Sequence, residues 1–383
     1  MDHPVIRWLM SDARRLTGSG EFLDAFAGRL RAEGVDVARI TTGVPILHPQ
    51  IVSYSGLWRV DQGVTERRYS HDDDIKTALS ISPILTAYRG GSERCRLTDP
   101  PRAGEFPILA ELRAEGLTDY IVLPVPFADG SHKALSLATR RPGGFTDADL
   151  ALFSELLPAL AFHLEIQALR RTARTLLDTY VGKLSGGRVL DGHIRRGMGE
   201  TIRAVIWLCD LRGFTMLSET LTRDALIEAL NGYFGPMGEA VTANGGEILK
   251  FIGDAMLAIF PAGADAGPAC RQALAAARAA QAALAQTNAV REAAGKPRID
   301  YGIALHVGDV MYGNIGSDTR LDFTVIGPAV NLTARIEGLC SKLGHSLLVS
   351  EDFARACGVA TGKVGEFELK GVAEKQAIHA LRA

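Results

Sequence analysis

The chain has 383 residues, which is long enough for two domains that each bury a core of their own. Its 42 Lys and Arg and 44 Asp and Glu residues leave a formal net charge of −2, which argues against nucleic-acid binding and against a basic membrane-binding surface. Five scattered cysteines without a Cys-x-x-Cys pair, and the lack of a signal peptide or membrane span, predict a cytoplasmic protein without disulfides or structural zinc.

The chain opens with short helical and β-rich segments. Residues 21–33 repeat apolar side chains at helical spacing, and Gly34 is typical of a helix C-terminus. Residues 50–60 are rich in β-branched and aromatic side chains and predict a strand. The acidic run His71–Asp74 is interpreted as a solvated loop and not as a metal site.

A hairpin and a capped helix follow. Residues 120–139 predict two antiparallel strands around an Asp-Gly turn. Thr146 and Asp149 have the spacing of a capping box, in a weaker Asp form. The apolar repeat from Leu150 to Leu164 predicts the helix that this box would start.

This hairpin, followed by Arg-Pro-Gly-Gly-Phe-Thr-Asp-Ala-Asp-Leu and an amphipathic helix, resembles the C-terminal part of a GAF sensor domain. The likeness covers residues 112–166 and implies an α/β sensor domain over residues 1–165. Such domains bind small ligands or dimerise, so the resemblance implies an effector of unknown identity at this domain.

The helical pattern then continues into a linker. Its apolar positions include Leu164, Ala168, Leu169, Ala173, Leu176, Leu177 and Tyr180. This stripe, with arginines on the other face, predicts either a parallel coiled coil between two identical chains or a helix lying on its own domain. Residues 185–188 and 195–199 interrupt the periodicity, so we assign residues 166–200 as a helical linker.

The remainder, residues 201–383, alternates strands and helices. Strands are expected at residues 204–209, 248–252, 255–260, 299–306 and 322–325, and helices at residues 217–243, 267–286 and 329–343. This order predicts an α+β domain in which helices pack on one face of a sheet.

Two acidic residues are candidates for a metal site. Two apolar runs flank Gly253-Asp254, which predicts a tight hairpin with Asp254 at its tip. Asp210 ends another strand, and if the two strands are neighbours the carboxylates lie close together. Divalent cations would offset their repulsion. Lys250 stands in an otherwise apolar strand of the same hairpin. Burying its positive charge costs free energy unless a partner or a ligand compensates it.

The surrounding residues point to a nucleoside triphosphate, because Mg²⁺ prefers one or two carboxylates together with phosphate oxygens. Gly213, Phe214 and Thr215 lead into a helix whose first backbone N–H groups would cradle phosphates. Asn331 and Arg335 are four residues apart on one helix face. There an amide and a guanidinium could stabilise charge on a pentavalent phosphorus.

Four motifs in order carry a strong resemblance. They are Asp-Leu-Arg-Gly-Phe-Thr, Leu-Lys-Phe-Ile-Gly-Asp, Gly-Asn-Ile-Gly-Ser, and Phe-Thr-Val-Ile-Gly with Val-Asn-Leu-Thr-Ala-Arg-Ile. Together they resemble the catalytic domain of class III nucleotidyl cyclases over residues 201–383. The resemblance implies a ferredoxin-like, palm-type domain and a homodimer whose active sites lie between two subunits.

The resemblance also implies roles for individual residues. Asp210 and Asp254, with the backbone carbonyl of Leu211, would bind two Mg²⁺ or Mn²⁺ ions per site. Asn331 would orient the ribose, and Arg335 would contact the phosphates in the transition state. No residue stands out as a general base.

The choice of base can be argued from hydrogen bonding. Adenine offers an acceptor and a donor, which suit a donating Lys250 and an accepting Thr324. Guanylyl-forming relatives carry Glu and Cys or Ser at these places. Many adenylyl cyclases have Asp where Thr324 stands, and the Thr form resembles the subclass that includes bicarbonate-responsive enzymes.

In a homodimer Lys250 would serve the site opposite to that of its own Asp254. Lys370 either reaches the terminal phosphates or is solvated.

We therefore expect an adenylate cyclase that converts ATP to 3′,5′-cyclic AMP and pyrophosphate, regulated by its N-terminal domain. A guanylate cyclase and a catalytically weak ligand-sensing dimer remain alternatives. A diguanylate-forming enzyme is disfavoured because Gly245-Gly246-Glu247 lacks the acidic and aromatic residues of its hairpin motif. His306 is interpreted as a core residue.

Overall fold

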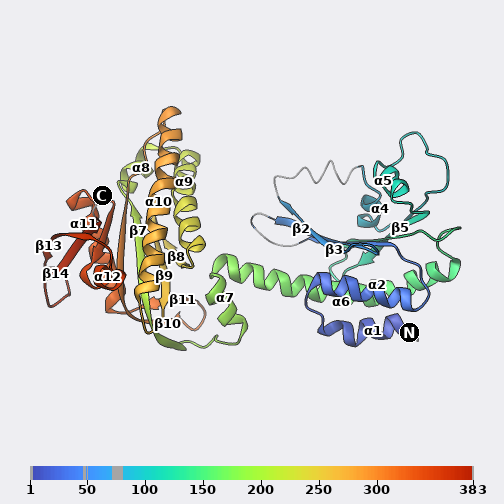
Figure 1. Cartoon of the computed structure of the whole chain (residues 1–383), viewed down its shortest axis with the longest axis horizontal. Helices are drawn as coiled ribbons and strands as arrows, with labels where there is room; N and C mark the ends of the chain where they lie inside the picture. Colours follow the sequence, from blue (N-terminus) through green and yellow to red (C-terminus); the bar gives the residue numbers. More distant parts are fainter. Residues whose placement is uncertain (1–2, 46–48, 50, 71–80, 382–383) are drawn as a thin grey trace. The chain divides into compact units, whose positions relative to one another are not determined.

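The computed structural model describes residues 3–45, 49, 51–70 and 81–381, so the acidic run His71–Asp74 lies outside the described residues. The chain divides into two compact units, residues 1–176 (unit 1) and residues 177–383 (unit 2), shown in Figure 1. Within the described ranges, every helix is too short or too polar to cross a membrane.

Unit 1 is built on one antiparallel sheet. Its helices are α1 (Pro4–Met10), the 3₁₀ helix η1 (Asp12–Arg15), α2 (Ser19–Ala32), α4 (Ile84–Tyr88), α5 (Ile108–Ala114) and α6 (Asp147–Tyr180). Its strands are β1 (Arg39–Pro45), β2 (Ile51–Arg59), β3 (Gly63–Ser70), β4 (Glu93–Arg96), β5 (Asp119–Pro126) and β6 (His132–Thr139). The strand order is β3-β2-β1-β6-β5-β4.

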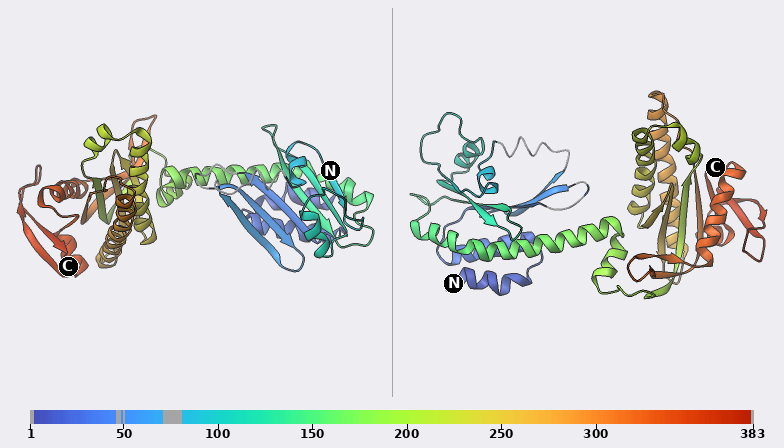
Figure 2. Two further views of the ribbon diagram at one scale, coloured as in Figure 1. Left: turned by 90° about the horizontal axis from the view of Figure 1, so that it is seen from above. Right: turned by 180° about the vertical axis from the view of Figure 1, so that it is seen from behind.

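Helices cover both faces of this sheet, as Figure 2 shows. Along β5, the alternate residues Ile121 and Leu123 pack in a core with α1, α2 and α6. Their neighbours Tyr120 and Val122 pack in a second core with α4 and α5. Strand alternation therefore divides one apolar strand between two cores, and unit 1 has three layers.

The local predictions for unit 1 are confirmed. Strands β5 and β6 pair antiparallel around the Asp-Gly turn, and Gly34 follows α2 with a φ of 84°. The capping box at the start of α6 is reciprocal, because Thr146 N donates to Asp149 Oδ2 at 2.8 Å and Asp149 N donates to Thr146 Oγ1 at 3.2 Å. Leu164 is buried in the core of unit 1, as expected for this position if the helix lies on its own domain.

Unit 2 is built on an eight-stranded sheet. Its helices are α7 (Lys183–Leu190), α8 (Phe214–Thr220), α9 (Arg223–Ala243), α10 (Gly267–Ala293), α11 (Pro328–Leu343) and α12 (Glu351–Cys357). Its strands are β7 (Gly199–Leu211), β8 (Glu247–Ile252), β9 (Ala255–Ala262), β10 (Tyr301–Gly316), β11 (Leu321–Ile326), β12 (Leu347–Ser350), β13 (Thr361–Phe367) and β14 (Gln376–Leu381). The order is β13-β14-β12-β10-β7-β9-β8, and β11 pairs with β10.

The sheet places the predicted hairpin beside the strand of Asp210. Strand β7 pairs with β9 up to Cys209↔Met256. Strands β8 and β9 close on Ile252↔Ala255, which leaves Gly253 and Asp254 as a two-residue turn, and Gly253 has a φ of 66°. The prediction of a tight hairpin next to the first strand is therefore confirmed.

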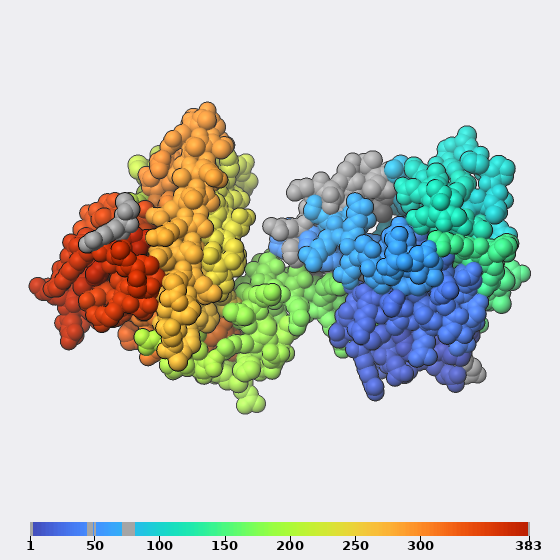
Figure 3. All heavy atoms as spheres, in the orientation of Figure 1, coloured from blue at the N-terminus to red at the C-terminus, as the bar shows by residue number. Residues whose placement is uncertain are grey.

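Two predictions about the helices of unit 2 are wrong. Helices α9, α10 and α12 share one core with the sheet, whereas α11 packs through Ile336 and Leu339 with Ala304 in another core. Helices therefore cover both faces of the sheet and not one; α10 lies along the face of the unit seen in Figure 3. The single helix expected at residues 217–243 is two, because α8 ends before Thr222, whose side chain caps α9.

The expected interruption at residues 185–188 is also wrong, because α7 runs through them. A buried carboxylate holds the first turn of this helix. Glu247 accepts from Ser185 N at 2.7 Å and from the Tyr312 hydroxyl at 2.8 Å. The hydroxyl oxygens of Ser185 and Tyr312 lie 2.8 Å apart. This tertiary contact overrides the low helix propensity of the two glycines at residues 186 and 187.

Candidate active site

Asp210 and Asp254 lie side by side where neighbouring strands end. Asp210 directly follows the Cys209↔Met256 pair, and Asp254 stands two residues before Met256. Their carboxyl groups are close enough to influence each other's charge. Burial, and after it the contact with Asp254, holds the pKa of Asp210 well above its usual range. The structure thus brings together the two carboxyl groups that the sequence singled out.

A third carboxyl group was missed by the sequence reasoning. Glu337 on α11 interacts electrostatically with Asp210 and Asp254, and burial, followed by Asp210, raises its pKa to about 7. Gly302, the residue paired with Asp210 across β7 and β10, leaves room for it. The sequence held one signal for it. Glu337 is an acidic residue on the side of α11 that carries the buried residues Ile336 and Cys340.

The two aspartates fit a divalent cation site. Their enforced contact is unfavourable when both are ionised, and a cation between them would remove the repulsion. Leu211 N donates to Asp210 Oδ1 at 3.0 Å, which fixes the orientation of that carboxylate. Among the residues described, no group of three or more His, Cys, Asp and Glu side chains is arranged to hold a metal. Further ligands would have to come from backbone, water and substrate, as Mg²⁺ favours.

The predicted phosphate-binding turn follows Asp210 closely. Gly213 has a φ of 69°, in the left-handed region that glycine tolerates, and is the N-cap of α8. No described side chain caps this helix. Phe214 packs against the main core of unit 2, and Thr215 is exposed.

The predicted base-binding residues lie on neighbouring elements. Lys250 Nζ on β8 is 3.6 Å from Asp322 Oδ2 on β11, so Lys250 has a partner that the sequence analysis did not name. Thr324 is two residues from Asp322 and therefore lies on the same side of β11. Its side chain is 3 % exposed, and its hydroxyl has no hydrogen-bond partner among the described residues.

The remaining candidates are exposed. Asn331 and Arg335 are both solvent-exposed on α11, and among the described residues no ion pair joins Arg335 to Asp210 or Asp254. The contacts of one chain therefore do not bring the helix candidates together with the aspartates. Lys370 is exposed in the turn after β13.

His306 is a core residue, as expected. Its ring Nδ1 is 2.8 Å from Ser350 Oγ, and burial lowers its pKa to about 4. A neutral imidazole in this position is part of the packing between β10 and β12.

Residues 199–383 match the family model described as the adenylate and guanylate cyclase catalytic domain. The chain is 41 % identical over 167 residues to an adenylate cyclase of Anabaena cylindrica, covering 43 % of this chain and 32 % of that relative. It is 33 % identical over 152 residues to adenylate cyclase 1 of Rhizobium meliloti (strain 1021), covering 39 % of this chain and 22 % of that relative. Among solved structures, the guanylyl cyclase Cya2 is 33 % identical, with a TM-score of 0.43, covering 47 % of this chain and 92 % of that one.

The chain spans less than a third of the length of these two curated relatives, whereas the family model covers nearly all of unit 2. The four sequence motifs, the paired aspartates and the α+β sheet lie within this matched region. Residues 199–383 are therefore the part of the chain that is similar to the catalytic domain of adenylate and guanylate cyclases.

Proposed function

We propose that the protein is an adenylate cyclase that converts ATP to 3′,5′-cyclic AMP and pyrophosphate. The observation that carries the proposal is that neighbouring strands bring Asp210 beside Asp254, within the region that matches the cyclase family model. The 41 % identity to an adenylate cyclase supports the choice of reaction. In this reaction the 3′ oxygen of ATP bonds to the α-phosphorus, the bond from that phosphorus to the pyrophosphate oxygen breaks, and the hydroxyl proton leaves to solvent.

Two divalent cations, Mg²⁺ or Mn²⁺, belong to this proposal. When bound, they supply charge that stabilises the attacking and leaving oxygens. Asp210, Asp254 and the backbone carbonyl of Leu211 would hold them. The raised pKa of Asp210 supports this assignment, because a divalent cation would offset the burial and the neighbouring charge of Asp254 that raise it.

The residues around the aspartates would position the triphosphate. The backbone of Gly213, Phe214 and Thr215 would contact phosphate oxygens beside the metals, since this turn follows Asp210 directly. Lys370 would contact the terminal phosphates from the turn after β13.

Lys250 and Thr324 would recognise adenine. The ion pair with Asp322 fixes the ammonium group of Lys250 on the side of β11 that also carries Thr324. The hydroxyl of Thr324 is buried without a partner, and a buried polar group of this kind costs free energy until a ligand satisfies it. These two observations support a base-binding edge, because Lys250 donates and Thr324 can accept.

We further propose that the active site is completed by a second copy of the chain. Asn331 would orient the ribose and Arg335 would stabilise charge on the phosphorus, both in the site whose metals the other copy holds. Their exposure on α11 supports this arrangement, because both side chains are accessible to another chain.

Helix α6 supports the dimer. Phe162, Leu169 and Leu176 recur every seven residues, and their exposed fractions are 45 %, 64 % and 37 %. A heptad stripe of this kind is what two parallel helices bury against each other. The stripe lies on the face away from Leu160 and Leu164, which pack in the core of unit 1.

Unit 1 is proposed to be a GAF-like sensor domain of a cytoplasmic enzyme. Its antiparallel sheet between two helix layers and the capping box at the start of α6 support this assignment. A ligand there would regulate cyclase output by changing how two catalytic domains meet, since small shifts of Arg335 relative to the metals alter the rate strongly.

The decisive experiment measures cyclic AMP formed from ATP and cyclic GMP formed from GTP by the purified chain with Mn²⁺. We expect cyclic AMP as the main product, and its loss in Asp254→Ala. Asp318→Ala is the matched control, because Asp318 is an aspartate of the same unit whose side chain is 88 % exposed. Cyclic GMP as the main product would identify a guanylate cyclase, and an inactive wild type would identify a sensing dimer.

The base-binding assignment has a separate test. A Lys250→Glu, Thr324→Cys double variant replaces the adenine-matching pair with the residues of guanylyl-forming relatives. The ratio of ATP to GTP turnover should fall by about tenfold to a hundredfold. An unchanged ratio would remove these two residues from base recognition without affecting the metal assignment.

A further inference from the structure

A cleft of about 320 Å³ lies between η1 and α6 in unit 1. This volume is at the lower end of the ~300–1,000 Å³ typical of small-molecule sites. Arg14 and Arg15 line the cleft from η1, and Arg170 lines it from α6. All residues concerned belong to unit 1, and none of them belongs to the cyclase site.

The charge of this cleft is uncompensated. Three guanidinium groups line it, no Asp or Glu does, and none of Arg14, Arg15 and Arg170 forms an ion pair with a described carboxylate. Several arginines elsewhere in unit 1 do have carboxylate partners: Arg94 and Arg96 contact Asp119, and Arg141 contacts Asp149. A concentration of like charge around one concavity favours an anionic ligand.

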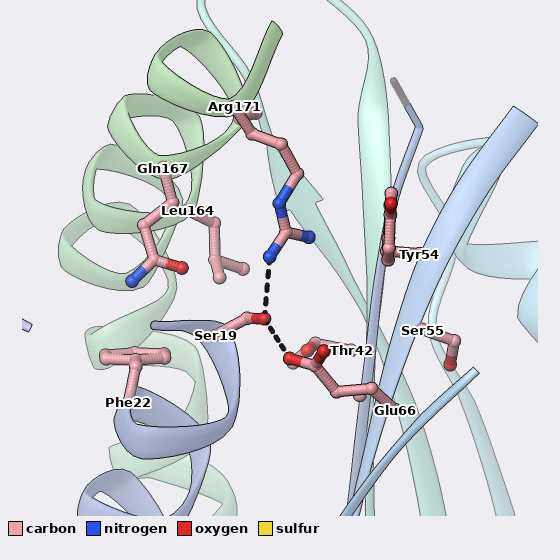
Figure 4. Close-up of a pocket in the computed structure, with 11 residues that line it drawn as sticks. Ser19, Phe22, Thr42, Tyr54, Ser55, Glu66, Leu164, Gln167 and Arg171 are labelled. Carbon is pink, nitrogen blue, oxygen red and sulfur yellow. Dashed lines mark hydrogen bonds between the residues drawn. The ribbon is translucent and has the colours of Figure 1, made fainter. Parts of the chain in front are cut away.

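Arg171, the next residue along α6, differs from Arg170 because its guanidinium has partners within unit 1 (Figure 4). It points into a second pocket, which is much smaller, with a volume of about 30 Å³. There it donates to Ser19 Oγ at 2.9 Å, and Ser19 in turn donates to Glu66. Its guanidinium also lies 4.5 Å from the centre of the Tyr54 ring. Arg171 is therefore used in holding α6, α2 and β3 together, whereas Arg170 is not.

The wall of the cleft is fixed by hydrogen bonds. Gln167 Nε2 donates to Leu16 O at 3.2 Å, which ties the end of η1 to α6. The same nitrogen lies 2.8 Å from His163 Nε2, and because an amide NH₂ only donates, the imidazole accepts there. His163 also stacks on Phe22, with ring centroids 3.9 Å apart. The arginines of the two elements therefore face a preformed wall, and binding need not order it.

The ring of His163 adds no charge to the cleft. Burial, and after it the positive charge of Arg170, lowers its pKa to about 4, so the ring is neutral near pH 7. Ser11 Oγ, also at the cleft, donates to Arg7 O at 2.8 Å and has only lone pairs left to offer. The charged donors that a ligand meets are thus the three guanidinium groups.

We propose that this cleft binds a small phosphorylated metabolite with at least two negative charges. A guanidinium presents paired N–H groups that match two phosphate oxygens, and groups on η1 and α6 would hold a dianion from two sides. The shared chemistry, a phosphate ester, also occurs in lipid headgroups; the proposal is for the free metabolite. It goes beyond the cyclase reaction and does not depend on it.

Calorimetric titration of the full chain with fructose 1,6-bisphosphate in metal-free, low-salt buffer tests the proposal. We expect saturable binding that weakens about tenfold or more in an Arg14→Gln, Arg170→Gln double variant. The single variant Arg15→Gln should weaken it less. Arg174→Gln is the matched control, because Arg174 is exposed on the same helix outside the cleft. It should bind as the wild type does.

In the calorimetric titration, two results would overturn the proposal: no binding by the wild type, or equal binding by the wild type and the double variant. The second would place the bisphosphate elsewhere, for example at the triphosphate site. Sedimentation with phosphatidic acid vesicles and phosphatidylcholine vesicles separates the two sources of phosphate. The free-metabolite assignment requires no co-sedimentation with either. Sedimentation with phosphatidic acid that the double variant abolishes would overturn it in favour of a membrane surface. Cyclase output, measured separately, bears only on the proposed reaction.

Discussion

The carboxylate of Glu337 occupies the space that a side chain at Gly302 would fill. A β-carbon at Gly302 would lie 2.5 Å from Glu337 Oε1, far inside van der Waals contact. Gly302 is the register partner of Asp210 across β10 and β7. The missing side chain on one strand thus lets α11 bring a third carboxyl group to the pair formed by Asp210 and Asp254.

The first prediction concerns Gly302→Ala. The new methyl group would meet Glu337 and would also lie 2.9 Å from Cys340 Cβ, so α11 must shift away from β10. We expect a loss of about 1–3 kcal/mol in unfolding free energy, measured by urea denaturation. Cyclase output should fall as well, because α11 carries Asn331 and Arg335.

The matched control is Gly362→Ala on β13, where an added β-carbon meets no atom within 4 Å. Its unfolding free energy should stay within about 0.5 kcal/mol of the wild type. Equal stability of the two variants would mean that the approach of Glu337 to Gly302 does not constrain α11.

The second prediction is a pH dependence of the metal-free chain. Burial and Asp210 raise the pKa of Glu337 from 4.5 to about 7, and the pKa of Asp210 is raised in the same direction. Between these values the folded chain keeps protons that the unfolded chain has lost. The contribution of these carboxyl groups to the unfolding free energy is therefore fully present below pH 4.5 and is lost as the pH rises towards 7. Thermal unfolding in EDTA across this range measures the slope.

Glu337→Gln should flatten that slope, because an amide does not titrate. The exposed Glu374→Gln should leave it unchanged. Mn²⁺ should raise the midpoint most at the upper end of the range, where ionised aspartates bind it. A Glu337→Gln variant with the wild-type slope would assign the pH dependence to other groups.

The features of the fold that could be predicted from the sequence are those that depend on residues close together in the chain. The turn at Gly253 needs a positive φ and two flanking apolar runs, and both are visible in the sequence. The capping box of Thr146 and Asp149 likewise involves residues three positions apart. The sequence analysis stated only as a condition that the strands of Asp210 and Asp254 are neighbours, and the sheet order meets this condition.

The parts that it missed depend on residues far apart in the chain. Helix α7 forms over a glycine pair because Glu247, 62 residues beyond Ser185, accepts from its first turn. The carboxylate of Glu337 lies against position 302, which lacks a side chain, and the pairing of β7 with β10 places that glycine beside Asp210. The cleft at Arg170 similarly requires η1 to pack on α6. Periodicity within one segment carries none of this information.

The third prediction concerns the attachment of α7 to the sheet. Tyr312→Phe removes the donor to Glu247 Oε2 and leaves that oxygen buried without it. We expect a loss of about 1–3 kcal/mol in unfolding free energy. Tyr180→Phe removes the same hydroxyl from a side chain that is 79 % exposed, and should cost little.

Hydrogen exchange locates the effect. If the contact between Glu247 and Tyr312 anchors α7, backbone amides of residues 185–190 should lose protection in Tyr312→Phe before those of β7 do. Uniform loss across unit 2, or none, would show that α7 is held by other contacts.

The fourth prediction tests the dimer through α6. Leu169→Glu with Leu176→Glu places four carboxylates along the heptad stripe of a parallel pair. Each buried leucine contributes about 1.5–3 kcal/mol, and like charges add repulsion, so the variant should be monomeric in sedimentation equilibrium. Cyclic AMP output should fall with it, because Arg335 of one copy would no longer meet Asp210 and Asp254 of the other.

Arg174→Glu is the control, since it introduces a carboxylate on the same helix away from the stripe and should leave the dimer and its activity intact. The folded state of the monomeric variant is checked by its unfolding transition, because both leucines are exposed in the single chain. A monomer with full activity would contradict the shared site, whereas a dimer that persists would place the interface elsewhere. The dependence of specific activity on protein concentration also distinguishes a shared site from a site within one chain. If two copies build each site, the specific activity of the variant must rise with protein concentration.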